Sequence, residues 1–329
     1  MSYLLRGMAA NGGIRVVAAD TTRIVEEIRL MHDASATATA ALGRSLTAGI
    51  LLSHILLKNH QDRISLRFLG DGPIGNVVVD AGLDGNIRAY ANNPSIELPL
   101  REDGKLDVGS AIGKGELEII RSHAPKGDEY RSSVSIVSGE VAEDVAQFLA
   151  QSEQIASAVL LGVRFKANST EIMTSAGIIL QAMPDADSAA LDLLEANVKA
   201  FGQLSNKLKT QSLLEVINEL CWGLEFELFT KDALPLQFKC RCSDEKALDA
   251  IAYFSPSERQ ELIDQDNGAE VVCHWCNTKR WITAEQIESI SKNEIRCPDC
   301  DALWYREGQN TMIQANERCA CGRKVILPN

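Results

Sequence analysis

The cysteines of this 329-residue chain place the strongest constraint on its fold. Eight of the nine follow residue 239, and they form four close pairs whose members are separated by one or two residues. The pairs are Cys240 with Cys242, Cys273 with Cys276, Cys297 with Cys300, and Cys319 with Cys321. In a secreted domain such pairs would suggest a disulfide framework, but the short separations and the reducing compartment expected for this chain favour metal thiolates.

The first two pairs predict a structural zinc site. Zinc in a closed structural site takes four tetrahedral thiolate ligands, and a Cys-x-Cys or Cys-x-x-Cys turn presents two sulfurs to one ion. The residues between the pairs contain a helix start at "SPSE" and a turn at "DNG". His274, inside the second pair, is an alternative ligand, but four thiolates are already available, so we expect its side chain to be exposed. The first cysteine set is Cys240, Cys242, Cys273 and Cys276.

The last two pairs repeat the pattern in reverse order and predict a second zinc site in a small ribbon-like module. Trp304 and Tyr305 would be the apolar core of that module, because so short a segment cannot fold on burial alone. The alternative is a group of redox thiols that bind no metal. The second cysteine set is Cys297, Cys300, Cys319 and Cys321, and the two sets together predict two zinc ions per chain.

Zinc-held thiolates also predict a redox response, because oxidants attack thiolates. Conversion of the cysteine pairs to disulfides would release the metal and remove roughly 10–16 kcal/mol of apparent binding energy. A whole domain is stable by only about 5–15 kcal/mol, so loss of the metal is expected to unfold the region that it organises.

The residues before the cysteines predict an α+β fold. Residues 32–60 are rich in Ala and Leu and predict a long helix, and β-rich runs separated by turn clusters predict strands at 63–70, 76–82 and 86–91. A helix is expected to start at Ser138. We therefore predict that residues 1–184 form a mixed α/β domain with a largely antiparallel sheet. "GDGPIG" matches a dinucleotide-binding pattern, but the run after it predicts a strand, so we interpret it as a turn.

Residues 185–238 predict a helical linker. Apolar residues recur there at three- and four-residue intervals, which is an amphipathic helical pattern. The pattern fits a helical layer packed on the first domain, and it fits equally a metastable segment that detaches and exposes its apolar face. Cys221 lies in this apolar stretch and is interpreted as a packed small hydrophobe. The remaining boundaries are 239–290 for the zinc-binding redox domain and 291–329 for the second module.

Composition excludes several classes of function. A net charge of −12 argues against binding to a phosphate backbone, and residues 291–329 have no basic stripe, so no nucleic-acid partner is expected. No run reaches the roughly 18 apolar residues of a membrane span, and the N-terminus lacks the features of a signal peptide. We expect a cytoplasmic protein with no membrane partner. A thiol–disulfide oxidoreductase that uses Cys273 and Cys276 is the alternative function, but the motif follows a long insertion rather than a strand of a thioredoxin-like unit.

Several motifs resemble one known family. They are "HDASATATAALGRSLTA", "GDGPIGNVVVDA", "SGEVAEDVAQFLAQSEQ", "SAGIILQAMPDAD", "CRCSDEK" and "VVCHWC". Over about 285 residues the chain resembles the redox-regulated heat-shock holdase chaperones of thirty-three kilodaltons from bacteria and plastids. The family pattern ends soon after "ITAEQIESI", so the second cysteine set departs from it.

The resemblance implies a non-enzymatic mechanism that uses no ATP. By this resemblance, the reduced, zinc-bound protein is expected to be a poor chaperone. The resemblance also implies that oxidation pairs Cys240 with Cys242 and Cys273 with Cys276, releases zinc and destabilises the linker. The oxidised protein would then form a homodimer and expose apolar surface to unfolded client proteins.

Overall fold

A computed structural model describes residues 1–123, 128–229, 233–292, 294–296, 303–306, 318–319 and 321. The chain divides into two compact units, Met1–Cys240 and Arg241–Asn329. The first unit carries most of the strands, and the second carries the cysteine pairs apart from Cys240. Both units mix helices with mainly antiparallel strands, which confirms the predicted α+β class.

The first unit contains two six-stranded sheets. Sheet A has the order β10-β1-β2-β9-β8, with β11 also pairing with β1, and sheet B has the order β12-β5-β4-β3-β6-β7. Every pair is antiparallel except β12 with β5. The strands of sheet A are β1 (Tyr3–Ala9), β2 (Ile14–Asp20), β8 (Ser157–Phe165), β9 (Ile172–Ala182), β10 (Glu227–Leu228) and β11 (Leu234–Pro235). Those of sheet B are β3 (Arg63–Gly70), β4 (Val77–Gly82), β5 (Asn86–Ala91), β6 (Gly115–His123), β7 (Asp128–Ser135) and β12 (Gln237–Phe238).

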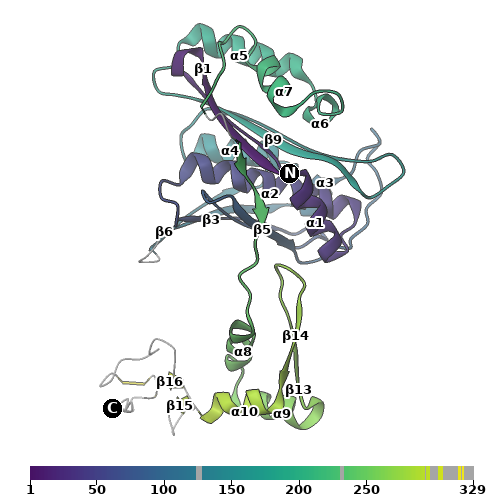
Figure 1. The fold of residues 1–329 in the computed structure, drawn as a ribbon, viewed down its shortest axis with the longest axis vertical. Helices are drawn as coiled ribbons and strands as arrows, with labels where there is room; N and C mark the ends of the chain where they lie inside the picture. Colours follow the sequence, from purple (N-terminus) through teal and green to yellow (C-terminus); the bar gives the residue numbers. More distant parts are fainter. Residues whose placement is uncertain are drawn as a thin grey trace. The chain divides into compact units, whose positions relative to one another are not determined.

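The long predicted helix exists and lies between the two sheets (Figure 1). α2 spans Ala36–Leu56, and the Ser35 side chain caps its first turn by accepting a hydrogen bond from the Ala38 N–H. Its small and aliphatic side chains are buried on nearly every face, as expected for a helix packed between two sheets. By length and composition α2 also qualifies as a membrane span, but 78% of that window is buried inside the protein, so it is the core helix.

Further helices complete the layers of the first unit. The strands of sheet A alternate their side chains between two cores: Val17 faces α2, and Val16 faces the opposite side. Leu194 and Phe201 of α5 cover that outer face together with α7 (Figure 1). The first-unit helices are the 3-10 turn Ala10–Gly12, α1 (Thr22–His32), α2, α3 (Val108–Ile112), α4 (Ala142–Gln151), α5 (Ser188–Phe201), α6 (Leu204–Lys207) and α7 (Leu213–Leu220).

The "GDGPIG" segment is a turn between β3 and β4, as predicted. Its glycines permit close approach of the backbone to α3. A Cβ on Gly70 would lie 1.9 Å from the Ile112 carbonyl oxygen, and one on Gly72 would lie 2.3 Å from that of Ala111. The glycines are therefore explained by packing and not by a phosphate ligand.

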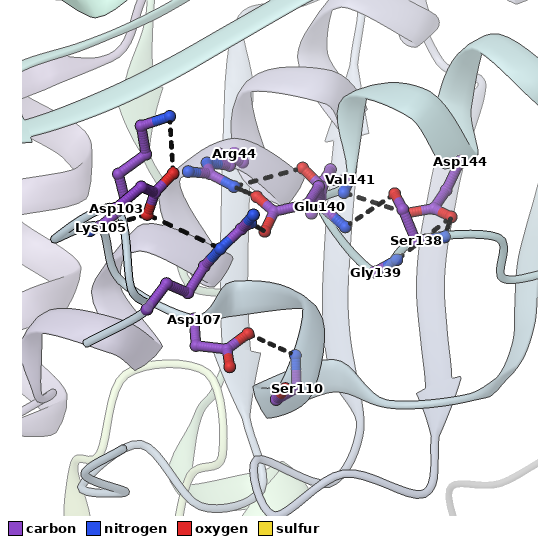
Figure 2. A network of polar contacts seen from close by, with 11 residues as sticks. Arg44, Asp103, Lys105, Asp107, Ser110, Ser138, Gly139, Glu140, Val141 and Asp144 are labelled. Atoms are coloured by element: carbon purple, nitrogen blue, oxygen red, sulfur yellow. Dashed lines mark hydrogen bonds and ion pairs between the residues drawn. The ribbon is translucent and has the colours of Figure 1, made fainter. Parts of the chain in front are cut away.

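The helix expected to start at Ser138 begins four residues later than predicted. α4 starts at Ala142, and the cap comes from inside the helix rather than from Ser138. The buried Asp144 carboxylate accepts hydrogen bonds from the backbone N–H groups of residues 137, 138, 139 and 141 at 2.8–3.4 Å (Figure 2). Val141 has φ 73°, a conformation that costs a β-branched residue energy, so the carboxylate stabilises a strained turn.

One half-buried histidine, whose ring nitrogens are shielded from solvent, makes the stability of this unit depend on pH. Both ring nitrogens of His54, near the end of α2, are buried without a hydrogen-bond partner in the described part of the chain. Burial, with smaller contributions from Arg6 and His60, lowers the pKa of His54 to about 4 from 6.5. Between pH 6.5 and pH 4, His54 is protonated in the unfolded chain but mostly neutral in the folded chain. A fall in pH through this range therefore favours unfolding.

We therefore expect the free energy of unfolding to fall by about 3 kcal/mol from this group alone as the pH drops from 7 to 4. Urea unfolding at a series of pH values measures the effect. In the His54→Leu variant, the fall in the free energy of unfolding between pH 7 and pH 4 should be smaller than in the parent by that amount. The exposed His60 provides the control His60→Gln, and equal pH dependence in the two variants would contradict the assignment to His54.

Among its described residues, the second unit has a small core. The apolar side chains of this core come from three helices and a hairpin, and seven of them are buried. The predicted helix start at "SPSE" is a capping box between Ser255 and Glu258, and the predicted turn at "DNG" has Asn267 in the left-handed conformation. The elements are α8 (Asp244–Ala252), α9 (Pro256–Asp266), β13 (Gly268–Val272), β14 (Lys279–Thr283), α10 (Ala284–Lys292), β15 (Glu294–Arg296) and β16 (Leu303–Arg306).

Candidate metal centre

The Cys-x-x-Cys pair lies at the tip of the β13–β14 hairpin. β13 ends at Val272 and β14 begins at Lys279, so Cys273 and Cys276 lie in the connecting loop. The Asn277 N–H donates to the Cys273 carbonyl at 2.8 Å, and the Cys273 N–H donates to the Thr278 carbonyl at 3.0 Å. These bonds fold the loop into a tight turn that brings two sulfurs to one side.

The Cys-x-Cys pair lies just before α8. Ser243 caps α8 by accepting a hydrogen bond from the Lys246 N–H, and the Lys246 ammonium donates to the Arg241 carbonyl at 2.8 Å. Arg241 is the residue between the two cysteines, so this second bond fixes the turn that carries them. The sequence did not identify Lys246, because no helix was predicted where α8 lies.

The structure brings the four sulfurs of the first cysteine set together. All four Sγ atoms lie within 4.8 Å of one another, and Cys242 Sγ is 3.5 Å from Cys276 Sγ. Four sulfurs in a tetrahedron about 2.3 Å from one zinc ion are about 3.8 Å apart. The cluster can therefore hold a metal ion, and its size and all-sulfur donor set fit zinc.

Charged and polar groups surround the cluster. The Arg280 guanidinium donates to the Asp244 carboxylate at 2.7 Å, and hydrogen bonds to Asp244 and, less strongly, Cys242 raise the pKa of Arg280. A zinc ion with four thiolates carries a net charge of about −2, which a nearby guanidinium partly offsets. Thr278 Oγ1 lies 3.1 Å from Cys276 Sγ. Arg280 and Thr278 were not foreseen from the sequence, although both follow the second pair within four residues.

The other predicted ligands are only partly described. Cys297 and Cys300 lie outside the described residues, while Cys319 is buried and Cys321 is exposed. The second site therefore stays a prediction. Trp304 and Tyr305 lie in β16, which pairs with β15, and the predicted role of their side chains falls outside what is described. His274 is exposed and is not part of the four-sulfur cluster.

Cys221 is placed as expected for a packed residue. It is 3% exposed in the core beneath α5 and α7, and burial raises the pKa of its thiol to about 12. A thiol with so high a pKa is a poor nucleophile at neutral pH.

Cys221→Ser should therefore leave unchanged the response to oxidants that the sequence predicts, since the residue lacks thiolate character. Activity of the oxidised variant in a client-aggregation assay measures this, with thermal unfolding as a check on folding. Loss of the oxidant response in a folded variant would show that Cys221 takes part.

The geometry of the hairpin differs from that of a thioredoxin-type oxidoreductase. In such enzymes the Cys-x-x-Cys motif of a βαβ unit is reactive because a helix N-terminus lowers the thiol pKa. Here the motif connects two antiparallel strands and is followed by β14. The arrangement is that of a turn that could present two sulfurs to one metal ion.

Comparison with known proteins agrees with the fold. The family model described as Hsp33 protein matches residues 2–283. A 33 kDa chaperonin of Thermus thermophilus is 48% identical, with 100% of this chain and 98% of the relative covered. One of Deinococcus radiodurans is 43% identical, covering 89% of this chain and 99% of the relative. The crystal structure of the 33 kDa chaperonin (Hsp33 homolog) of Thermotoga maritima superposes with a TM-score of 0.81 at 30% identity, covering 88% and 98% of the two chains.

An α+β unit followed by a smaller unit, with four cysteines gathered into a cluster that could hold a metal ion, defines a two-unit α+β protein with a candidate metal centre. The chain belongs to the Hsp33 family. Membership supports a chaperone role. The family model ends at residue 283, but the Thermus relative covers the whole chain, so the C-terminal extension is shared with that relative.

Proposed function

We propose that this chain is an ATP-independent holdase chaperone that binds unfolded client proteins after oxidation of the first cysteine set. It acts by binding rather than by catalysis, in a reducing compartment such as the cytosol. The observation that carries the proposal is the four-sulfur cluster, within 4.8 Å, in a unit with only a small apolar core. Membership of a chaperone family supports the binding of unfolded clients.

The first cysteine set would hold one zinc ion, and the second set a second one. A bound ion would cross-link the Cys-x-Cys turn and the Cys-x-x-Cys turn, which are thirty residues apart in the sequence. Lys246 and the hairpin backbone orient the sulfurs, and Arg280 offsets their charge. The seven buried side chains of the described apolar core of this unit are alanines and isoleucines, so we expect the metal to supply a large share of the energy that keeps the unit folded.

Oxidation removes the charges that hold the metal. Two disulfides form from four thiolates, and the four electrons pass to two molecules of a peroxide-class oxidant. The pairing implied by family resemblance joins Cys240 to Cys242 and Cys273 to Cys276. Peptide mapping of the oxidised protein tests this pairing, and a homodimer after oxidation is tested by sedimentation.

The helical segment that follows β9 is the proposed linker. Only Leu194 and Phe201 of α5 are buried, and most of its other side chains are exposed or half-exposed. α7 is better anchored, through Leu213, Val216, Ile217 and Leu220. A helix held by two buried side chains is marginally docked, because each contributes roughly 1.5–3 kcal/mol.

Zinc content and client binding should be measured on the same samples before and after peroxide treatment. We expect two zinc ions per chain in the reduced protein, and suppression of light scattering by urea-denatured citrate synthase only after oxidation. A measured content of one zinc ion per chain would show that the second cysteine set binds no zinc. Equal suppression of light scattering by the reduced and the oxidised protein would contradict redox control of client binding. Catalytic reduction of insulin would favour the oxidoreductase alternative.

Weakening the linker should activate the protein without an oxidant. Leu194→Ser with Phe201→Ser removes the buried contacts of α5 and is expected to cost about 3–6 kcal/mol of docking energy. Under reducing conditions, with zinc retained, residues 186–230 should become protease-sensitive and partial holdase activity should appear. Leu193→Ser with Leu214→Ser alters exposed leucines as the control (38% and 39% exposed). A double variant as resistant and inactive as the parent would mean that the linker is not metastable.

A further inference from the structure

Strand β8 forms a long, apolar edge of sheet A. Among the described strands it pairs only with β9, so its other side has no neighbour. Its sequence, "SAVLLGVRF", has a single charged residue, Arg164. Exposed apolar edges of this length are rare in stable proteins, because they pair with other chains.

The other sheet edges of the first unit are protected. β10 and β11 at the far side of sheet A, and β12 in sheet B, are two residues long. The long edge strand β7 has the sequence "DEYRSSVS", with three charged residues. Short strands and charged side chains are the usual protection of an edge. β8 is thus the one long edge in the two described sheets of the first unit that lacks it.

The hydrogen bonds show which groups of β8 face outward. The Ala182 N–H donates to the Ala156 carbonyl at 3.0 Å, whereas the Met183 N–H donates to Gly13 on the other side of β9. Ladder bonds alternate along antiparallel strands, so even-numbered residues of β8 bond to β9. The N–H and C=O groups of Val159, Leu161 and Val163 therefore point away from the sheet. No described group bonds to them.

A groove of about 610 Å³ runs along this edge. Residues Val159–Phe165 line it continuously, and one wall is formed by charged residues of α2, the 101–106 loop and the start of α4. Figure 2 shows three of them, Arg44, Lys105 and Glu140. The opposite wall is Gly202–Ser205, at the start of α6. With Arg101 and Arg164 included, the lining holds four cationic side chains and two carboxylates, Glu140 and Glu143.

We propose that this edge is a docking site for an extended, apolar segment of an unfolded client, which adds to sheet A as a strand beside β8. Main-chain hydrogen bonds give sequence-tolerant affinity, as a chaperone of many clients requires. The excess of cations favours segments flanked by Asp or Glu over segments flanked by Lys or Arg. This site rests on the proposed function.

The linker restricts access to the same strand. α6 packs over the outer face of β8, where a Cβ on Gly162 would lie 3.0 Å from the Ser205 backbone nitrogen. Undocking of the linker would remove one wall of the groove and leave room for a longer segment. Client docking at β8 is therefore expected to be stronger in the oxidised protein.

The test separates main-chain pairing from apolar contact. The probe is a fluorescein-labelled peptide of alternating valine and threonine with glutamate at both ends. Its fully backbone N-methylated form is the control, since it has the same side chains and no N–H groups. On the oxidised full-length protein we expect the N-methylated peptide to bind at least tenfold more weakly. We also expect hydrogen exchange of Val159, Leu161 and Val163 to slow on binding while β7 is unchanged.

A matched pair of variants tests the strand itself. Val159→Pro removes an outward N–H, whereas Val159→Ala removes the same side chain and keeps the N–H. We expect the proline variant to bind the peptide at least tenfold more weakly than the alanine variant. Equal binding by the two peptides on the parent protein would overturn the proposal, even if Val159→Pro failed to fold. If the oxidised parent does not suppress aggregation but still distinguishes the peptides, the edge site stands and the proposed function falls.

Discussion

Cys276→Ser is expected to abolish zinc binding by the first cysteine set and to unfold residues 241–292. Three thiolates and a hydroxyl hold zinc far more weakly than four thiolates, and metal binding supplies roughly 10–16 kcal/mol in such sites. That energy equals or exceeds the stability of a typical domain, about 5–15 kcal/mol. Zinc per chain should fall by one, and hydrogen exchange of β13 and β14 should approach that of an open chain. The first unit should keep its protection.

His274→Ala is the matched control, because His274 lies in the same loop but outside the sulfur cluster. It should keep both the zinc and the exchange protection. Full zinc retention by Cys276→Ser, together with zinc loss by His274→Ala, would show that the histidine is the ligand and would revise the site.

Asp144→Ala is expected to cause a large loss of stability in the first unit. The carboxylate satisfies four backbone N–H groups beside a residue at φ 73°, and it is fully buried. Hydrogen bonds to a charged group contribute about 1.5–3 kcal/mol each, and buried N–H groups left unpaired add a penalty. We expect a loss of about 3–5 kcal/mol in urea unfolding, since part of the turn will relax.

Glu143→Ala is the control for Asp144, because the exposed neighbouring carboxylate makes none of these bonds. It should change the unfolding free energy by less than about 0.5 kcal/mol. Asp144→Asn should fall between the two variants, since an amide retains one acceptor oxygen. A loss below about 1 kcal/mol for Asp144→Ala would mean that other groups or water hold the turn.

The sequence supported much of the fold, because its strongest signals are local. The Ala-rich run that became α2 and the alternating runs that became β3, β4 and β5 report secondary structure directly. The start of α4 was misplaced because Ser138 resembles a cap, whereas the capping carboxylate comes from the third position of the helix. β10, β11 and β12 were not foreseen. Strands of two residues have no periodicity and exist only because a distant partner strand is present.

In the candidate site too, only the features that depend on local sequence were predictable. Short cysteine spacing determines which sulfurs share a turn, so the first cysteine set could be named before any geometry was known. Arg280, Lys246 and Thr278 could not be named, because their contacts with the cysteine turns depend on how the hairpin and α8 pack. The same limit applied to the β8 edge. Its composition was visible, but its lack of a partner is a property of sheet order.

The pairing of β1 with β10 and β11 has a consequence for synthesis on the ribosome. The outer neighbours of β1 come from Glu227–Leu228 and Leu234–Pro235, more than two hundred residues later in the chain. At about 5–20 residues per second, β1 waits on the order of ten to fifty seconds for these strands to be translated. A nascent chain stalled before residue 227 presents β1 as an open edge. A member of a chaperone family thus passes through a long stage in which one of its own strands lacks its outer neighbours.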